Sequence, residues 1–420
     1  MATQAAQGPE FNPFAPEVLS SPWEAYARMH QGAPVFAVPG TPITYVAGYD
    51  ALVEALGRVE DFSNDFGGIL SGARATHPEV KAILDTGWPA VDTLLTADPP
   101  VHTRFRKLVN LAFSMKRVDA IEERIRGICV RLIEAMLAKA GPVDFVADFA
   151  IPLPVGVIAA EIGMDSSTDI ATVKRWSDAF ADRLGQMIPH ERELECAREV
   201  VEYQHHAKAL IDARRAQPTD DLLSDLVHAS VDGETPLSDA EIMSILQQLM
   251  VAGNETTTST LAGGLLLLIE NPGAEAQVRA DPSLIPNMVE EMLRLESPTS
   301  GLWRVVKRDT ELAGVPVKAG TMLMARFAAA NRDPTKFPEP DRFLPDRKTA
   351  RTHLAFGRGI HMCVGNMLSR RELAVAFQEL FARVARFELA PGFVPSWKPN
   401  MLLRGLSRLD VVLTPADPRP

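Results

Sequence analysis

The spacing of apolar residues along the chain predicts a mainly helical protein. Apolar side chains recur with the period of an α-helix through most of the sequence. The helices expected from this pattern cover residues 22–31, 50–57, 100–140, 153–162, 168–184, 191–216, 238–270, 285–295 and 364–384. Alternation typical of short strands is confined to residues 35–46, 303–325 and 408–413, so strands are a minor component.

The longest helical pattern, residues 238–270, has recognisable ends. Ser238 and Glu241 have the spacing of a capping box, and Asn271-Pro272 is a stop signal. At 1.5 Å per residue, about 32 residues extend roughly 48 Å. A helix of this length can cross a whole domain.

The segments between these elements give no sign of a domain boundary. Residues 64–100 are rich in glycine and proline and are expected to form a long functional loop, and residues 331–347 an irregular meander. The ends, residues 1–10 and 415–420, are expected to be frayed tails. We therefore expect a single domain over residues 1–420.

Composition and charge exclude several classes of protein. Hydrophobic residues make up 46% and charged residues 23%, which is a globular balance. The net charge of -11 argues against a nucleic-acid-binding protein. The longest apolar stretch, residues 261–269, is too short for a bilayer, and the N-terminus has no signal-peptide pattern. A cytoplasmic protein without a membrane anchor is the expectation, and the 3 cysteines fit a reducing compartment.

Cys363 differs from the other two cysteines in its surroundings. Cys129 belongs to a helical face and is expected in the core, whereas Cys196 lies among charged residues and is expected at a helix surface. Cys363 lies in the segment FGRGIHMCVG, whose glycines permit tight turns and the close approach of a bulky planar group. A helix starting just after it would favour a thiolate, a soft metal ligand. Taken alone, the segment fits a metal ligand and a buried cysteine in a turn equally.

The segment also resembles the haem-binding loop of the cytochrome P450 family, the haem-thiolate monooxygenases. The family pattern F-x-x-G-x-x-x-C-x-G is met at Phe356, Gly359, Cys363 and Gly365. The resemblance implies that Cys363 is the axial thiolate of haem b, and that Phe356, Gly357 and Gly365 belong to the haem site. It also implies the family fold, a triangular, mainly helical single domain with small β-sheets. Thiolate ligation favours cleavage of the O–O bond.

Two further segments resemble structural motifs of this family. Glu291 and Arg294 form an E-x-x-R about 70 residues before Cys363, with both charges on one helical face. Phe337 to Phe343 is similar to the meander motif. The resemblance implies that Arg342 joins Glu291 and Arg294 in a buried charge cluster.

The middle of the longest helical pattern carries the sequence AGNETT, residues 252–257. A glycine costs about 1 kcal/mol against alanine in a helix, and a threonine hydroxyl can bond a carbonyl four residues back and bend the helix. The segment resembles the oxygen-binding groove of the family. That implies a proton relay by Glu255 and Thr256, with Glu255 where many bacterial relatives have aspartate.

The resemblance extends to residues that contact haem and substrate. His102 and Arg106 are four residues apart on one helical face and match an H-x-x-x-R that contacts a haem propionate, and Arg304 and His361 match further propionate contacts. The implied substrate pocket includes Leu70, Trp88, Leu249, Ala252, Leu302 and Leu402. These apolar positions favour a neutral, lipophilic substrate, and the resemblance implies that this substrate is hydroxylated with O2.

The sequence has no flavin, nicotinamide or iron–sulfur motif, so the resemblance implies electrons from NAD(P)H through separate proteins, a [2Fe–2S] ferredoxin and its reductase. The basic residues expected on the docking face are Arg104, Lys107, Arg117, Arg358, Arg370 and Arg371. Two alternatives are a peroxide-driven haem enzyme and a haem-binding sensor or carrier without turnover. The pair Glu255 and Thr256 argues against both.

Overall fold

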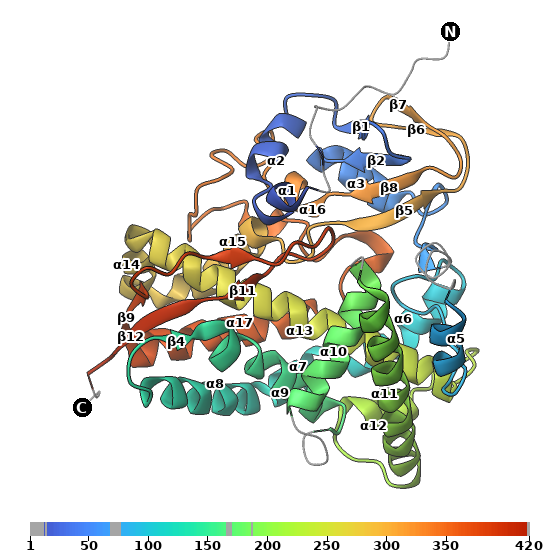
Figure 1. Ribbon diagram of the computed structural model, residues 1–420, viewed down its shortest axis with the longest axis horizontal. Coiled ribbons are helices and arrows are strands. Elements are labelled where there is room, and N and C mark those ends of the chain that lie inside the picture. The colour runs from blue at the N-terminus through green and yellow to red at the C-terminus, as the bar shows by residue number, and fades with distance from the viewer. Residues whose placement is uncertain (1–11, 13–14, 68–76, 165–169, 186–187, 418–420) are drawn as a thin grey trace. The chain divides into compact units, whose positions relative to one another are not determined.

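The computed structural model describes residues 12, 15–67, 77–164, 170–185 and 188–417 (Figure 1). The expected tail at residues 1–10 lies outside these residues. Within them the chain forms two compact units. The first unit contains residues up to Ser63, Glu122–Leu153 and Glu255 onwards, and the second contains Asn64–Ile121 and Pro154–Asn254. The expectation of one domain over residues 1–420 stays a prediction.

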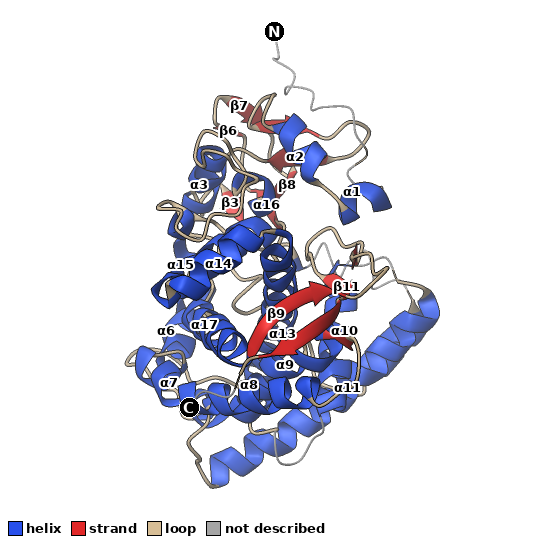
Figure 2. Cartoon of the chain, turned by 90° about the vertical axis from the view of Figure 1, so that its left-hand side faces the viewer, coloured by secondary structure: helices blue, strands red, loops and turns tan. Residues whose placement is uncertain are grey.

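Helices dominate the described chain, as the apolar period predicts (Figure 2). Those of the first unit are α1 Pro16–Ser20, α2 Trp23–Met29, α3 Tyr49–Gly57, α8 Glu122–Leu137, η1 Val146–Ala150, α14 Pro272–Ala280, η2 Pro282–Leu284, α15 Ile285–Glu296, α16 Phe327–Ala330, η3 Ala350–Thr352, η4 Gly359–His361 and α17 Asn366–Arg383. The helices of the second unit are α5 Pro78–Leu84, α6 Val101–Ala112, α7 Met115–Ala120, α10 Ile170–Gly185, α11 His190–Ala216 and α12 Leu222–Val227. Two further helices, α9 Pro152–Glu161 and α13 Asp239–Glu270, contain residues of both units.

A five-stranded mixed sheet organises the N-terminal part of the first unit. Its strand order is β1–β2–β8–β5–β3, with the bounds Val35–Ala37, Ile43–Val46, Met322–Ala325, Leu302–Val306 and Phe62–Ser63. Only β2 and β8 pair in parallel among its described strands. Apolar residues of α3, including the fully buried Leu52, pack with Phe62 and Leu323 in one core. Figure 1 shows α3 and α16 beside these strands.

Three smaller sheets complete the first unit. The longest strands, β9 Val384–Leu389 and β12 Asp410–Pro415, pair with each other, and β4 Val143–Asp144 pairs with β12 (Figure 1). A second pair joins β10 Ser396–Trp397 to β11 Leu406–Arg408. The hairpin of β6 Thr310–Leu312 and β7 Val315–Val317 turns through Ala313 and Gly314, both with positive φ, as a two-residue hairpin turn requires. This turn divides the strand pattern expected over residues 303–325.

The ends of α13 follow their sequence signals. The backbone N–H of Ser238 donates to Glu241 Oε2 at 2.8 Å, and the backbone N–H of Glu241 donates to Ser238 Oγ at 3.4 Å. This reciprocal pair is the predicted capping box. The helix ends at Glu270, and Pro272 starts α14, which the sequence pattern does not predict.

Several expectations about local structure are wrong. Residues 64–100 contain the helix α5, and residues 100–140 form three helices instead of one. The C-terminal tail begins later than expected, because Pro415 ends β12 and the N–H of Ala416 donates to the carbonyl of Arg383; residues 418–420 lie outside the described part. Cys196 is buried, since α11 packs this face against its own unit, whereas Cys129 lies in the core as predicted.

Among the described helices, none combines the length and apolarity needed to cross a bilayer.

Candidate functional site

The loop that carries Cys363 is shaped by glycine and ends at a helix. Gly357 and Gly359 have φ angles of 65° and 75°, and a Cβ on Gly359 would lie 2.8 Å from the carbonyl oxygen of Leu56. The backbone N–H of Cys363 donates to the carbonyl of Phe356 at 2.9 Å. The side-chain amide of Asn366, the first residue of α17, donates to the carbonyl of Cys363 at 2.7 Å. The backbone of Cys363 is therefore fixed just before the N-terminus of an 18-residue helix, whose dipole favours a thiolate.

A buried charge cluster that the sequence reading missed supports the start of this loop. Glu290 of α15 is 1% exposed. It accepts hydrogen bonds from Arg370 Nε at 2.7 Å and from His353 Nε2 at 3.0 Å. The backbone N–H of Ala355 donates to His353 Nδ1 at 3.1 Å, which places the imidazole proton on Nε2. The arginine also lies over the ring of Phe356, 4.4 Å from its centroid. Glu290 thus fixes His353 and Arg370, which contact Ala355 and Phe356 in the segment before Cys363.

The environment keeps Glu290 ionised and His353 neutral. Burial alone would raise the pKa of Glu290, but the hydrogen bonds from His353 and Arg370 outweigh burial and lower the pKa to about 2. Burial lowers the pKa of His353, and its hydrogen bond to Glu290 opposes this only partly. The one signal in the sequence is the acidic doublet Glu290-Glu291 in an otherwise apolar helix. It does not reveal which residues meet the first carboxylate.

The E-x-x-R pair does form a buried cluster, but its third member differs from the expected one. Arg294 donates to Glu291 Oε2 from Nε at 2.7 Å, and both side chains are fully buried. Arg347 donates to Glu291 Oε1 from Nε at 2.8 Å. The side chain of Arg342 is 63% exposed and pairs with Glu339, so its expected place in the cluster is wrong.

The backbone of the meander explains why Arg347, and not Arg342, pairs with Glu291. The carbonyl of Arg342 accepts hydrogen bonds from the guanidinium groups of Arg294 and Arg347, so its own side chain points away from them. Arg347 also donates to the carbonyls of Pro338 and Glu339. The cluster therefore ties the irregular residues 331–347 to α15.

In α13, hydroxyl groups bond back to the carbonyls of the two residues expected to relay protons. Ser259 Oγ donates to the carbonyl of Glu255 at 2.7 Å, and Thr260 Oγ1 donates to the carbonyl of Thr256 at 2.9 Å. The donor hydroxyls therefore belong to the next turn of the helix, and their hydrogen bonds fix the peptide groups of Glu255 and Thr256. Thr257 Oγ1 lies 3.3 Å from Ser369 Oγ, which joins α13 to α17 in the first unit.

The candidate propionate contacts lie on elements of both units. In the second unit, His102 of α6 is 1% exposed, and burial followed by the positive charge of Arg106 lowers its pKa to about 4. In the first unit, Arg304 of β5 is buried and donates from one Nη to the carbonyl of Trp303 at 2.7 Å, and His361 ends the turn η4. His102 is thus neutral at pH 7 and can serve as a neutral hydrogen-bond donor, whereas Arg304 supplies a charge.

Comparisons with known proteins agree on one family. The family model described as Cytochrome P450 matches residues 164–401. The chain is 36% identical to the steroid C26-monooxygenase of Mycobacterium tuberculosis over 94% of both chains. It is also 36% identical to the 6-deoxyerythronolide B hydroxylase of Saccharopolyspora erythraea, over 93% of this chain and 96% of the relative. The solved structure of cytochrome P450 CYP109Q5 from Chondromyces apiculatus matches with a TM-score of 0.85 and 33% identity, over 97% of this chain and 99% of that one.

The chain belongs to the cytochrome P450 family. It has the P450 fold, as the motifs predict, and it is a monooxygenase, an oxidoreductase that uses O2. The family binds haem b as its cofactor.

The residues of this P450 fit a haem group. A Cβ built on Gly365 or on Gly253 would meet no described atom within 4 Å, so both positions leave room beside their backbones. Gly365 follows Cys363 by two residues, and a thiolate at Cys363 would be a soft donor. Phe356 offers an apolar ring. Arg106 and Arg304 carry the charge that the haem carboxylates require.

The basic residues expected to form a docking face for an electron carrier are mostly paired with acids. In the second unit, Arg104 pairs with Glu241 at 2.7 Å, Lys107 with Glu234 at 2.5 Å and Arg117 with Asp220 at 2.7 Å. In the first unit, Arg370 pairs with Glu290 and Arg371 with Glu122. Arg358 of the cysteine loop is exposed. The expected positive patch is therefore largely neutralised within each unit.

The six apolar positions expected in the substrate pocket have different surroundings. Leu70 lies outside the described residues. Trp88 is held by backbone hydrogen bonds to Gln204, and Leu249 and Leu402 are buried. Ala252 is exposed and Leu302 is half-buried. Their common role in a pocket stays a prediction.

Proposed function

We propose that this P450 hydroxylates a neutral, lipophilic small molecule, with Cys363 as the axial ligand of the haem iron. The geometry of the cysteine loop carries this proposal. Positive-φ glycines and the bond from Cys363 N–H to the Phe356 carbonyl hold the backbone of Cys363 in place, and the start of α17 favours a thiolate there. Haem, when bound, supplies the activation of O2, and a thiolate ligand favours cleavage of the O–O bond.

Glu255 and Thr256 hold and pass protons in this proposal. Their side chains are half-buried in the middle of α13, and their carbonyls are engaged by Ser259 and Thr260. These hydrogen bonds keep the two peptide groups in place, so that the carboxyl and hydroxyl groups project from a fixed backbone. A carboxyl group and a hydroxyl group in sequence can move a proton inward by exchanging hydrogen bonds.

Arg106 and Arg304 bind the two haem carboxylates, and His102 and His361 add hydrogen bonds. Arg304 is buried in the sheet, which holds its guanidinium group rigidly. The lowered pKa of His102 lets it donate a hydrogen bond without bringing a second positive charge next to Arg106. The haem carboxylates therefore balance the positive charges of the two arginines.

A lipophilic substrate fits the character of the expected pocket residues. Leu249, Ala252, Leu302 and Leu402 are apolar. Two relatives are named for a steroid and for 6-deoxyerythronolide B as substrates. The test is to titrate the ferric protein with steroids, macrolide aglycones and charged aromatic acids. Displacement of the water ligand by a neutral compound shifts the Soret band and supports the proposal, whereas shifts with charged acids alone would contradict it.

Electrons come from NAD(P)H through a ferredoxin reductase and a [2Fe–2S] ferredoxin. The docking surface that we propose is the exposed part of the cysteine loop, Arg358, Ile360 and Met362. Ile360 is 39% and Met362 is 43% exposed. Apolar contact next to one cation suits a small acidic carrier.

Reconstituted turnover tests this reaction and its electron donor. With ferredoxin, reductase, NADPH and isotopically labelled O2, the product should carry one labelled oxygen atom. Arg358→Glu should raise the apparent KM for ferredoxin at low salt and reduce its salt dependence. The matched variant Arg342→Glu, whose side chain pairs with Glu339, should behave as the wild type. Unlabelled product would exclude monooxygenation, and equal KM values would exclude this docking surface. A cytoplasmic location stays a prediction.

A further inference from the structure

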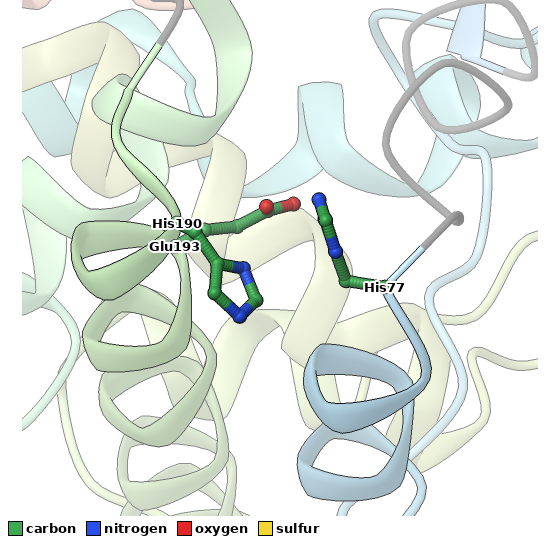
Figure 3. Close-up of side chains that lie close together, drawn as sticks. All are labelled: His77, His190 and Glu193. Carbon is green, nitrogen blue, oxygen red and sulfur yellow. The ribbon is translucent and has the colours of Figure 1, made fainter.

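Three potential metal ligands meet where α5 lies against α11, in the second unit. His77 is the residue before α5, His190 is the first residue of α11, and Glu193 follows one helical turn later. One ligand atom of each side chain lies within 4.8 Å of those of the other two. Figure 3 shows the three side chains converging from the two helices. The rings of His77 and His190 are 4.3 Å apart between centroids.

The three ligand atoms lie within 4.8 Å of one another, which is wider than the spacing in a formed metal site. Bonds of about 2.0–2.1 Å in a tetrahedral zinc site place neighbouring ligand atoms about 3.4 Å apart. Small rotations about the side-chain bonds suffice to reach this spacing, because His77 is exposed and the other two side chains are half-buried. Two imidazoles and one carboxylate suit zinc and similar late first-row cations, whereas calcium and magnesium prefer oxygen ligands alone.

A second observation concerns the orientation of His190. Its Nε2 lies 3.3 Å from Glu79 Oε2. Its Nδ1 is buried, and no described residue hydrogen-bonds it. Histidine ligands commonly donate the proton of one ring nitrogen to a carboxylate, which directs the lone pair of the other nitrogen to the metal. Glu79 orients His190 in this way and leaves Nδ1 as the ligand atom.

Most of the charged groups around the site are acidic or are paired with acids. Arg192 is the nearest cation of α11 in the sequence, and Asp182, Glu195 and Glu199 all lie within ion-pair distance of it. Lys81 of α5 pairs with Asp85 at 2.5 Å. Glu79 adds a negative charge next to His190. The site therefore contains carboxylates close to the ligands, and Arg192 and Lys81 are paired with acids. Arg183 of α10 interacts electrostatically with Glu193 and is the positive charge that a bound cation would face there.

A metal ion at this site would attach the N-terminal end of α5 to α11. The segment after α5 is already attached to α11, because Trp88 N–H donates to Gln204 Oε1 and Gln204 Nε2 donates to the Trp88 carbonyl, both at 3.0 Å. Residues 190 and 204 are about 20 Å apart along α11 at 1.5 Å per residue. The metal would supply a second attachment at the other end of α5.

We propose that His77, His190 and Glu193 bind one zinc ion, or a similar late first-row divalent cation, with water as the fourth ligand. The bound ion clamps α5 onto α11. The three ligands belong to the second unit and the cysteine loop to the first, and the existence of the site does not depend on the reaction that the protein catalyses.

Calorimetric titration with zinc chloride tests the site directly. The holoprotein is purified without a histidine tag, treated with a chelator and titrated at neutral pH. We expect about one zinc ion per chain. His77→Ala and Glu193→Gln should each weaken binding at least tenfold. Glu191→Gln removes the same charge from an exposed position in the same turn of α11 and should leave the affinity unchanged.

Hydrogen exchange provides the second measurement. Zinc should slow the exchange of amides in residues 78–84 of the wild type and should have no effect in His77→Ala. The folded state of each variant is checked by circular dichroism. Absence of saturable binding would overturn the proposal. Equal affinity in His77→Ala, Glu193→Gln and the wild type would overturn it as well, because the zinc would then bind elsewhere.

Discussion

Replacing Glu290 by glutamine should weaken both the fold and the support of the cysteine loop. The carboxylate is buried at 1% exposure and accepts hydrogen bonds from His353 and Arg370. Glutamine keeps the size of the side chain but removes its charge. It can accept at one oxygen only, so one of the two donors loses its acceptor and Arg370 loses its counter-charge. Phe356, below the guanidinium group of Arg370, then loses part of its fixed position.

The expected magnitude follows from the pKa of Glu290. Its folded-state value of about 2 is roughly 2.5 units below the ordinary 4.5. At about 1.36 kcal/mol per unit, the ionised form contributes about 3 kcal/mol to the free energy of unfolding. Because the folded pKa is depressed, this contribution is present above the unfolded pKa and is lost as the pH falls through the folded value. The difference between wild type and Glu290→Gln should therefore be constant from pH 8 to 5 and shrink by roughly 1 kcal/mol between pH 5 and 3.5.

Urea unfolding followed by far-ultraviolet circular dichroism measures this difference. At pH 7 the midpoint of Glu290→Gln should move by about 3 kcal/mol divided by the slope that both proteins share. Glu60→Gln, at an exposed position, should change the free energy by less than about 0.5 kcal/mol. A difference below about 1 kcal/mol at pH 7, or one that grows as the pH falls, would refute the reasoning.

Three further predictions follow from buried groups of the site. Arg347→Ala should cost roughly 3 kcal/mol in urea unfolding because it leaves Glu291 with one counter-charge, while Arg342→Ala should cost less than about 0.5 kcal/mol; equal losses would contradict the assignment of Arg347. Thr256→Ala should keep substrate binding but release peroxide in place of product, and unchanged coupling of NADPH oxidation to product would remove this hydroxyl from the relay. The pKa of His102 is lowered to about 4, so the wild type loses stability as the pH falls from 6.5 towards 4, because the unfolded chain binds a proton at this histidine and the folded protein does not. Over this pH range, the free energy of unfolding of His102→Gln should fall by up to about 3 kcal/mol less than that of the wild type. Parallel pH profiles of the two free energies would contradict the lowered pKa.

The sequence predicts the regular elements because their signals are local. The capping box of Ser238 and Glu241, the stop at Asn271 and the turn at Gly314 each depend on neighbouring residues. The cysteine loop is predictable for the same reason. Its fixed residues lie within ten positions of one another.

The charge partners could not be predicted, because they join residues far apart in irregular segments. Arg342 and Arg347 lie five residues apart in the meander, and no period indicates which side chain points towards Glu291. Glu290 meets His353 and Arg370 from segments 63 and 80 residues away. The burial of Cys196 was predictable in principle. Buried residues of α11 recur at helical spacing from Cys196 through Val200, Tyr203, Ala207 and Ile211, but the charged neighbours obscured this face.

The assignment of Cys363 as the haem ligand is tested most directly by the spectrum of the ferrous protein with bound carbon monoxide. The wild type and the matched variants Cys129→Ala and Cys196→Ala should show the long-wavelength Soret band of a thiolate-ligated haem. Cys363→Ala should lack this band while it retains its helical circular dichroism. Survival of the band in Cys363→Ala, or its loss in Cys129→Ala or Cys196→Ala with the fold intact, would contradict the account.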